Sequence, residues 1–575
     1  MPRDEESHPP PPDRTPVLIV GGGPAGLATA VELAAHGVAS TVVETRPAVS
    51  WLRPRAKTTS ARTMEHLRRW GLADAVRERA ALAPSWSDEV VFCTTLLGPE
   101  VTRFDRCFGL DLGADHLVAE AGQQIPQPAV ELVLREAVAA LPDTRLATGW
   151  TVTAVEQDGG GATALVQDGA GRVRSIRASY VVGCDGARSV VRDAIGAVFE
   201  GEDDGRPNFN LVFRAPGLAE LVRHGNAVQY WALNPRQPGV VGRMDLADTW
   251  WCIAMGVEAD RGAADPVGLV RALIGEPGAG VPIEIVATDP WRARMRLADR
   301  FGSGRVFLAG DAAHLNPPWG GHGYNTGIGD AVNLGWKLAA VLNGWAPPSL
   351  LDSYEAERRP VAAETIAVAV RNMATLAPEL ADPRLLGPPA EFAAARPAVA
   401  AAVRAAKDRE FHSLDLVLGT SYAHSPIVAS AGAAGAAGTA DASGAASASG
   451  PPQDGAETPP DGDYRPSAAP GNRLPHRWLA PGRSLYDVLG PEYSLVGELT
   501  APAAAPIAEA ARRLGIPLTV VELPGARDWF EAPLVLVRPD QHVAWRGHRM
   551  DEAGALRLLL GGTGHHTRPT LENSP

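Results

Sequence analysis

With 575 residues the chain is too long for a single hydrophobic core, and ordinary domain sizes predict two to four domains. Hydrophobic residues make up 45% of it and charged residues 21%, which is typical of a soluble globular protein. The formal net charge of −13 argues against nucleic acid as a partner and against binding to an anionic membrane surface, because both favour a basic face.

The four cysteines indicate neither a disulfide framework nor a metal site, because they are scattered without a CxxC pair. They are Cys93, Cys107, Cys184 and Cys252, and we expect free thiols in a reducing compartment. The opening segment, MPRDEESHPPPPDRT, lacks the apolar core of a signal peptide, so residues 1–14 are predicted to be a disordered lead. No uncharged apolar run approaches the roughly 18 residues of a membrane helix, and a cytoplasmic location is expected.

Residues 16–44 have the pattern of a βαβ unit, in which a strand, a glycine-rich turn, a helix and a second strand follow one another. The turn GGGPAG contains Gly21, Gly23, Ala25 and Gly26, and Glu44 ends the second strand. GxGxxG spacing is a weak signal in a chain with 61 glycines, but its position between strand and helix strengthens it. We expect a pyrophosphate at the helix N-terminus and a ribose that donates hydrogen bonds to Glu44.

Two later motifs also lead from a strand into a turn. YVVGCDGARSVVRDAIG, residues 180–196, reaches a turn at Asp185, which either contacts a cofactor or caps the following helix. GRVFLAGDAAH, residues 304–314, places Gly310 and Asp311 after a buried-type strand, where the carboxylate could bind a ribityl hydroxyl. The stretch PPWGGHGYN, residues 317–325, then leads into a long helix whose N-terminal amides could face an electron-rich ring edge.

In this order the three motifs resemble those of the single-component FAD monooxygenases with a p-hydroxybenzoate hydroxylase-like fold, over roughly residues 15–375. The similarity is closest to the phenol and 2,4-dichlorophenol hydroxylase branch, whose relatives tailor aromatic polyketides in actinobacteria. Residues 54–72 and 124–137 look like cofactor-contacting segments of that branch, which would place Arg55 and Gln127 against FAD. Residues 465–490 resemble the beginning of its C-terminal thioredoxin-like domain, although no cysteine follows position 252 and thiol chemistry is excluded there.

The resemblance implies an α/β architecture, in which a Rossmann-like FAD-binding domain interleaves with a β-rich substrate domain and precedes a thioredoxin-like domain. We expect the FAD-binding domain at residues 15–75, 123–199 and 288–385, and the substrate domain at residues 76–122 and 200–287. After these we expect a helical connector at 386–428, a flexible linker at 429–463, the thioredoxin-like domain at 464–565 and a tail at 566–575. The linker leaves open whether the last domain is docked or loosely tethered.

The resemblance further implies that reduced FAD reacts with O2 to give a C4a-hydroperoxide, which hydroxylates a phenolic or other electron-rich aromatic or heteroaromatic substrate. No second dinucleotide motif follows a strand, so NADPH or NADH would bind transiently as the reductant, without a domain of its own. The sequence favours neither, because it has no distinct arginine cluster. We expect a role in secondary metabolite biosynthesis, such as that of an antibiotic. Baeyer–Villiger oxidation or epoxidation, and a flavin-binding regulatory or scaffold protein, are the alternatives. A homo-oligomer remains one option for its assembly.

The stretch PPWGGHGYN is expected to form the floor under the flavin ring, because proline lacks an amide proton and glycine lets the backbone approach a flat ring. Pro318 would stand at the reacting face. Gly323, Tyr324 and Asn325 would contact the cofactor, with Asn325 donating to its pyrimidine edge. His322 could sense proton movements or contact substrate, although a solvent-facing histidine is the simpler interpretation.

Substrate contacts are expected from the strand region at residues 226–256 and from the same loop. Tyr230, Trp231, Arg243 and Trp319 are the candidates to line the pocket, and plain core packing is the alternative for each aromatic residue. Phenol hydroxylase places an aspartate where this chain has Lys57, so the catalytic base is open. Lys57 could hold an oxyanion, or it could be a solvated or phosphate-facing lysine.

Overall fold

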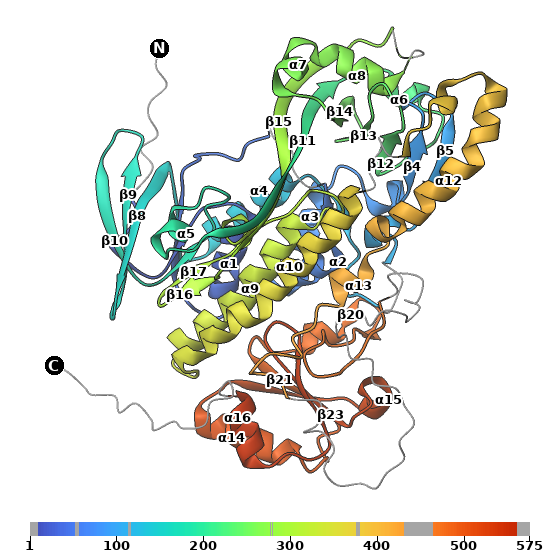
Figure 1. Ribbon diagram of the computed structural model, residues 1–575. Coiled ribbons are helices and arrows are strands. Elements are labelled where there is room, and N and C mark those ends of the chain that lie inside the picture. Colours follow the sequence, from blue (N-terminus) through green and yellow to red (C-terminus); the bar gives the residue numbers. More distant parts are fainter. Residues whose placement is uncertain are drawn as a thin grey trace.

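The computed structural model describes residues 10–51, 57–112, 117–275, 278, 280–374, 380–429 and 464–559. Arg55, most of the predicted lead, the predicted linker after residue 429 and the predicted tail lie outside these ranges. Figure 1 shows two bodies with β-sheets connected by long strands, and a third body beneath helices α9 (Gly323–Leu342) and α10 (Asp352–Ala374). No helix in the described part of the chain is both long and apolar enough to cross a membrane.

The first body is built on an eight-stranded sheet whose central strands are parallel and run in the order β17-β10-β1-β2-β7. Parallel strands are buried on both faces, which explains continuous apolar runs such as Val17–Val20 and the fully buried β2. The strands are β1 (Arg14–Val20), β2 (Ser40–Glu44), β7 (Thr144–Thr148), β8 (Trp150–Asp158), β9 (Gly161–Asp168), β10 (Val173–Gly183), β16 (Gly302–Ser303) and β17 (Val306–Leu308).

Helices cover this sheet. They include α1 (Pro24–Ala35), α2 (Ala61–Arg69), α3 (Ala73–Arg79), α4 (Gln127–Ala140) and α5 (Val190–Ala194), and α1 packs against both α4 and α9. α2 and α3 are separate helices, because Gly71 adopts a φ of 73° after α2. A short β-ribbon, β3 (Thr58–Thr59) with β6 (Gln123–Gln124), precedes α2 and α4.

The second body has an eight-stranded sheet in the order β18-β15-β11-β14-β13-β12-β4-β5, mostly antiparallel. Its strands are β4 (Val90–Cys93), β5 (Glu100–Phe104), β11 (Phe199–Arg214), β12 (Gln229–Ala232), β13 (Gly239–Arg243), β14 (Thr249–Met255), β15 (Glu284–Ala298) and β18 (His314–Leu315). The predicted start of the last FAD-binding segment at residue 288 is wrong, because β15 pairs with β11 of this sheet as far as Ala298.

The two faces of the second sheet bury separate cores. One core packs under α8 (Pro266–Ile274), with α6 (Leu218–Leu221) and α7 (Ala259–Ala264) nearby. The other packs against α12 (Pro389–Phe411), which together with α13 (Leu414–Leu418) forms the predicted connector. Val399 and Val403 of α12 share this core with Trp231 and Trp319, so the connector helix is a wall of the substrate domain.

The C-terminal body has the thioredoxin-like order, with strands β22-β21-β23-β24, β21 parallel to β22 and β23 antiparallel to both neighbours. Its elements are β21 (Tyr493–Gly497), α14 (Ala504–Leu514), β22 (Leu518–Glu522), α15 (Ala526–Phe530), β23 (Leu534–Val537), β24 (Val543–Gly547) and α16 (Glu552–Leu559), after a small β19 (Trp478–Ala480) and β20 (Arg483–Ser484) ribbon. Trp336, in the C-terminal half of α9, and Trp345, which follows α9, lie in the same core as Tyr493, so this domain is docked rather than loosely tethered.

The ordered chain also begins earlier than predicted. Arg14, assigned to the disordered lead, belongs to β1, where it pairs with Arg177 of β10. The amide of Arg177 donates to the carbonyl of Asp13 at 2.9 Å. The apolar pattern missed this extension because the strand starts with polar residues at the edge of the sheet.

His36, which follows α1, connects the first body to the C-terminal domain. Its ring nitrogens lie 2.8 Å from Glu492 and 3.3 Å from Glu32, and its side chain is buried. Burial opposes the charged form, but the hydrogen bonds to the two carboxylates outweigh it and raise the pKa of His36 to about 9.

We predict that this contact weakens at alkaline pH. A raised pKa in the folded state stabilises the protein fully below the unfolded value of 6.5, and this contribution is lost as the pH rises through about 9. The loss should be on the order of 3 kcal/mol. Urea unfolding of wild type and His36→Gln at several pH values measures it, and the difference between the two should shrink from pH 6 to pH 9.5. A difference that is constant with pH would contradict the assignment.

Candidate active site

Glycine lets three segments approach one another at the carboxyl edge of the first sheet. A Cβ at Gly21, whose φ is 103°, would lie 2.4 Å from the carbonyl oxygen of Cys184. A Cβ at Gly26 would lie 2.0 Å from the carbonyl oxygen of Gly21. A Cβ at Gly23 would meet nothing within 4 Å, and α1 starts there with no side-chain cap. The N-terminus of α1 is therefore open to a phosphate group.

Glu44 closes the side of this turn. Its carboxylate accepts hydrogen bonds from the amide of Gly22 at 2.6 Å and from the amide and Nε of Arg46, both at 2.8 Å. Arg46 also reaches Glu131 of α4 at 2.9 Å. The sequence did not single out Arg46, which places a guanidinium two residues after the end of β2, where the predicted ribose and phosphates would lie.

Asp330 of α9 fixes the turn after β17. We call residues 310–314 the Gly310 turn. The Asp330 carboxylate accepts from the amide of Gly310 at 3.0 Å and contacts Nε2 of His314 at 2.7 Å, and Arg358 of α10 donates to it at 2.8 Å. Burial disfavours its charge, but His314 and Arg358 outweigh burial and lower the pKa of Asp330 to about 2. The side chain of Asp311, which follows Gly310, is exposed at this edge.

The three motifs meet, but their members have different tasks. A Cβ at Gly310 would lie 3.0 Å from the Cβ of Ala25, so Ala25 serves the packing of α1 against the Gly310 turn. Asp185 accepts from the hydroxyl of Ser189 at 2.5 Å and from the amide of Val191 at 3.2 Å. The carboxylate of Asp185 therefore caps the following helix, and its contact with the cofactor stays a prediction.

The loop at residues 317–325 is held in place by hydrogen bonds of the Asn325 side chain. The amide nitrogen of Asn325 donates to the carbonyls of Thr58 at 3.2 Å and Gly321 at 2.9 Å, while its oxygen accepts from the amide of Ser60 and the hydroxyl of Thr63. The expectation that this side chain donates to a ring edge is wrong, because both of its hydrogens are used. The α9 N-terminus has no side-chain cap, so its backbone amides remain as the donors at this position.

The aromatic side chains of this loop point toward the interior, whereas its proline at the predicted reacting face does not. Pro318 is exposed and Trp319 is buried. Tyr324 shares a short hydrogen bond with Thr59, and burial raises the pKa of its hydroxyl. The expectation of a solvent-facing His322 is wrong: the residue is 6% exposed, and burial lowers its pKa to about 4. The His322 imidazole is therefore neutral and faces the interior, and its Nε2 has no hydrogen-bond partner among the described residues.

Lys57 is half-buried beside this loop, and its amine contacts residues of the second body rather than bulk solvent alone. Its Nζ donates to the carbonyl of Val228 at 2.6 Å and lies 5.3 Å from the ring centre of Trp251. Burial, together with the positive charge of Arg243, holds the pKa of Lys57 well below its usual range. Its neighbour Thr58 approaches the loop closely. The lowered pKa favours the neutral amine, the form that can accept a proton.

Strand alternation separates the predicted pocket residues. Trp231 faces the core that contains Trp319, with their ring centres 5.6 Å apart. Tyr230 points to the opposite face, where its hydroxyl donates to the carbonyl of Gly225 at 2.6 Å. Arg243 is opposite Trp250 in the ladder and lies 5.3 Å from that ring, on the same side as Tyr230. The prediction for Tyr230 is therefore wrong, and Arg243 influences Lys57 through its charge.

Further aromatic and charged residues lie on the face of the second sheet that carries Trp231 and Trp319. Trp291 lies 6.5 Å from Trp319, measured between ring centres. Lys407 of α12 lies 4.6 Å from the ring of Trp231 and pairs with Glu410 at 2.6 Å. The sequence does contain a signal for Lys407, because it continues the apolar four-residue spacing of Val399 and Val403.

Comparison with known proteins shows which family has this arrangement of domains. Residues 14–369 match the FAD binding domain family, and residues 467–561 match the C-terminal domain of aromatic-ring hydroxylases. The first match alone covers more than half of the 575 residues. The chain belongs to the FAD-dependent aromatic-ring hydroxylases.

Similar proteins span nearly the whole chain of this hydroxylase. A 4-methyl-5-nitrocatechol 5-monooxygenase from a Burkholderia species is 34% identical, over 96% of this chain and 98% of its own. The rebeccamycin biosynthetic enzyme RebC, in a structure with reduced flavin, has a TM-score of 0.83 at 32% identity, over 96% of this chain and 100% of RebC. Aklavinone-11 hydroxylase, in a complex with FAD and aklavinone, has a TM-score of 0.76 at 27% identity, over 95% and 99%. These relatives confirm the expected fold class and the expected enzyme family.

The residues at the edge of the first sheet of this hydroxylase fit FAD. The bare N-terminus of α1 suits the pyrophosphate, and the exposed carboxylate of Asp311 suits a ribityl hydroxyl. Gln124 of β6, which the sequence did not single out, is 1% exposed, and neither atom of its amide has a partner among the described residues. A buried amide in that state indicates a polar group at this position. Gln127, the first residue of α4, is half-buried a few residues away and stays a predicted contact.

We predict that Gly23→Ala separates cofactor binding from stability. The added methyl group meets no protein atom within 4 Å, so the apoprotein should unfold like wild type. The methyl group would project into the space at the α1 N-terminus, so FAD should bind at least about tenfold more weakly, as measured by titration of apoprotein followed by flavin fluorescence. Gly21→Ala is the matched variant that should lose stability instead, because its Cβ would clash with the backbone of Cys184. Wild-type FAD affinity in Gly23→Ala would contradict this placement.

Proposed function

We propose that this hydroxylase inserts one oxygen atom of O2 into a phenolic or other electron-rich aromatic or heteroaromatic substrate, with NADPH or NADH as the reductant. A role in secondary metabolite biosynthesis is part of the proposal. It is supported by similarity to RebC, which belongs to rebeccamycin biosynthesis, and to aklavinone-11 hydroxylase.

One observation carries this proposal: a half-buried lysine lies beside the loop predicted to hold the flavin ring. Lys57 directly precedes Thr58, whose hydroxyl would be 2.5 Å from a Cβ at Gly321. On its other side Nζ contacts the Trp251 ring. A ring system stacked in this space would therefore have an aromatic surface and a basic nitrogen together.

The chain's own groups would prepare the substrate. Bound FAD supplies the oxygen-transfer chemistry, and transfer is faster to a phenolate than to a phenol because the ring is richer in electrons. The neutral amine of Lys57 would take the phenolic proton and would then hold the phenolate as an ammonium ion. Both the proton acceptor and the oxyanion roles considered for Lys57 fall on one atom in this scheme.

The walls would keep the reacting centre dry. Trp231 is fully buried and stacks on Phe92 at 5.3 Å, and Trp319 is 4% exposed. The indole nitrogens of Trp231 and Trp319 have no hydrogen-bond partner among the described residues. Two buried donors on an apolar wall suit a planar substrate that carries acceptor oxygens. Exclusion of water favours oxygen transfer over the release of hydrogen peroxide.

The first experiment is oxidation of NADPH and NADH by the purified enzyme, with and without phenols, naphthols, hydroxypyridines and larger phenolic polycycles. A product that is heavier by one oxygen atom, formed with little hydrogen peroxide, supports the proposal. Product NMR separates a new hydroxyl group from a lactone or an epoxide, which would indicate the Baeyer–Villiger or epoxidising alternative. Bound FAD with no ligand-stimulated oxidation would favour a regulatory flavoprotein.

We predict that Lys57→Met lowers kcat/KM by about 10²–10⁴-fold, the usual contribution of a general base. Because the pKa of Lys57 is lowered, the wild-type amine is neutral above that pKa, and the rate should fall as the pH drops through it. The variant should lose this acidic limb of the pH profile, which initial rates across pH measure.

Lys57→Arg is the matched variant, because arginine keeps the positive charge and stays protonated. A proton acceptor is lost in both variants, whereas a residue that only holds an oxyanion would be rescued by arginine. Wild-type activity of Lys57→Met with the best substrate of the panel would exclude both roles.

A further inference from the structure

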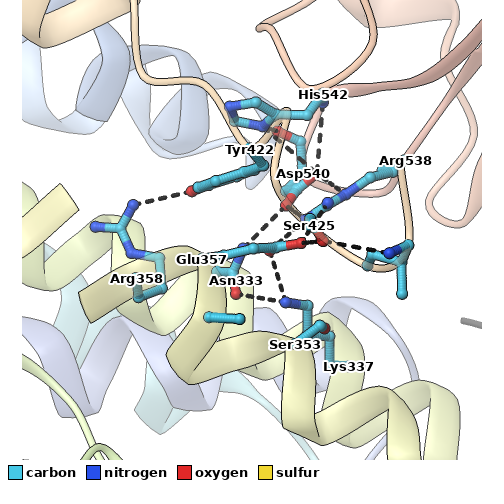
Figure 2. A network of polar contacts seen from close by, with 12 residues as sticks. Asn333, Lys337, Ser353, Glu357, Arg358, Tyr422, Ser425, Arg538, Asp540 and His542 are labelled. Carbon is cyan, nitrogen blue, oxygen red and sulfur yellow. Dashed lines mark hydrogen bonds and ion pairs between the residues drawn. The ribbon is translucent and has the colours of Figure 1, made fainter. Parts of the chain in front are cut away.

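A network of buried polar side chains joins the C-terminal domain to α9 and α10 (Figure 2). Arg538 donates to both carboxylate oxygens of Glu357, at 2.7 and 2.8 Å, and to Asp540 at 2.6 Å. Asn333 and Lys337 of α9 each donate to Glu357 at 2.7 Å. All five side chains are buried. Such a network holds one geometry, because a displaced partner would leave a desolvated charge unpaired.

The network continues toward the Gly310 turn through two residues outside the C-terminal domain. The ring of Tyr422, which follows α13, lies 4.4 Å from the ring of His542 and 5.1 Å from the guanidinium of Arg538. Arg358 of α10 donates to the hydroxyl of Tyr422 at 2.9 Å (Figure 2). The same guanidinium donates at 2.8 Å to Asp330, the carboxylate that holds the Gly310 turn. A continuous series of contacts therefore runs from the C-terminal domain to the flavin-binding edge.

We propose that the C-terminal domain acts as a clamp on the Gly310 turn, and that Tyr422 and Arg358 are the positioning residues that connect the two. This inference rests on the FAD site proposed above. It gives a domain without cysteines a task that needs no thiol chemistry. The helix α9 supports the same clamp, because Trp336 near its C-terminal end lies in the core of the C-terminal domain while its N-terminus faces the predicted flavin ring.

The effect of breaking this connection should be moderate. A cavity of about 40 Å³ adjoins Arg358, Tyr422 and Asp540, which is enough space for water. Water can therefore replace part of a lost hydroxyl contact to Arg358. We expect a change of about five- to tenfold in FAD affinity, less than the full value of one hydrogen bond to a charged group.

The test compares Tyr422→Phe with Ser425→Ala in the full-length protein. Each variant removes one buried hydroxyl that contacts a charged side chain of α10, because Ser425 donates to Glu357. Of the two residues, Tyr422 is the one that contacts Arg358, and the Arg358 guanidinium also donates to Asp330. Three quantities are measured: the FAD dissociation constant, the visible spectrum of the bound flavin and the melting temperature of the apoprotein.

We expect both variants to lower the melting temperature to a similar extent. Tyr422→Phe alone should weaken FAD binding by about five- to tenfold and shift the flavin spectrum. Unchanged FAD affinity in Tyr422→Phe, or an equal loss in Ser425→Ala, would overturn the clamp. Failure of wild type to bind FAD would instead overturn the proposed function, so the two failures can be distinguished.

A double-mutant cycle with Arg358→Lys tests the connection itself. Lysine keeps the charge near Asp330 but loses the fork that spans Asp330 and Tyr422. If both residues act through one contact, the double variant should bind FAD about as weakly as Arg358→Lys alone. Effects that multiply as for independent sites would show that Tyr422 does not act through Arg358.

Discussion

One buried carboxylate, that of Asp330, holds the parts of the cofactor edge in register. It receives the amide of Gly310 and contacts His314 on one side, and it pairs with Arg358 on the other. A charge with no exposure to water is tolerated only when its hydrogen bonds are complete, so these partners must all be in place. The turn after β17, the segment that leads into the predicted flavin loop, and α10 are therefore all fixed relative to α9 by this one carboxylate. Displacement of any one of them would leave the buried charge of Asp330 incompletely paired.

The polar groups at the proposed substrate site differ from Asp330, because they have no such complete set of partners among the described residues. Lys57 is half-buried, no carboxylate among the described residues pairs with it, and desolvation lowers its pKa. His322 is neutral for the same reason, and the indole nitrogens of Trp231 and Trp319 are unpaired among the described residues. Stability alone would favour apolar side chains at these positions. The proposed role of binding and deprotonating a ligand would require such polar groups, desolvated but still available to a substrate.

Much of the fold could be predicted from local patterns, whereas the tasks of individual side chains could not. The βαβ unit, the parallel strands and the thioredoxin-like order follow from apolar runs, glycine turns and the family resemblance. Spacing does not reveal which way a polar side chain points. Asn325 lies in a flavin-loop motif, yet its amide is spent on Thr58 and Gly321. Tyr230 and Trp231 are neighbours in sequence, but the two-residue repeat of a strand sends them to opposite cores. Asp330, Gln124 and Arg46 depend on contacts between segments distant in sequence.

The junction with the C-terminal domain shows why charged groups are retained there although apolar packing would be simpler. The core around Trp336 packs apolar side chains of α9 against those of the C-terminal domain. Apolar contacts tolerate small shifts and rotations, because they have no preferred direction. The fork of Arg538 on Glu357 and the hydrogen bond from Arg358 to Tyr422 are directional, so they fix the orientation of α10 as well as its distance. Since α10 carries Arg358 to Asp330, that orientation is transmitted to the Gly310 turn. In the proposed clamp, the buried charges therefore contribute a defined position of this turn as well as stability.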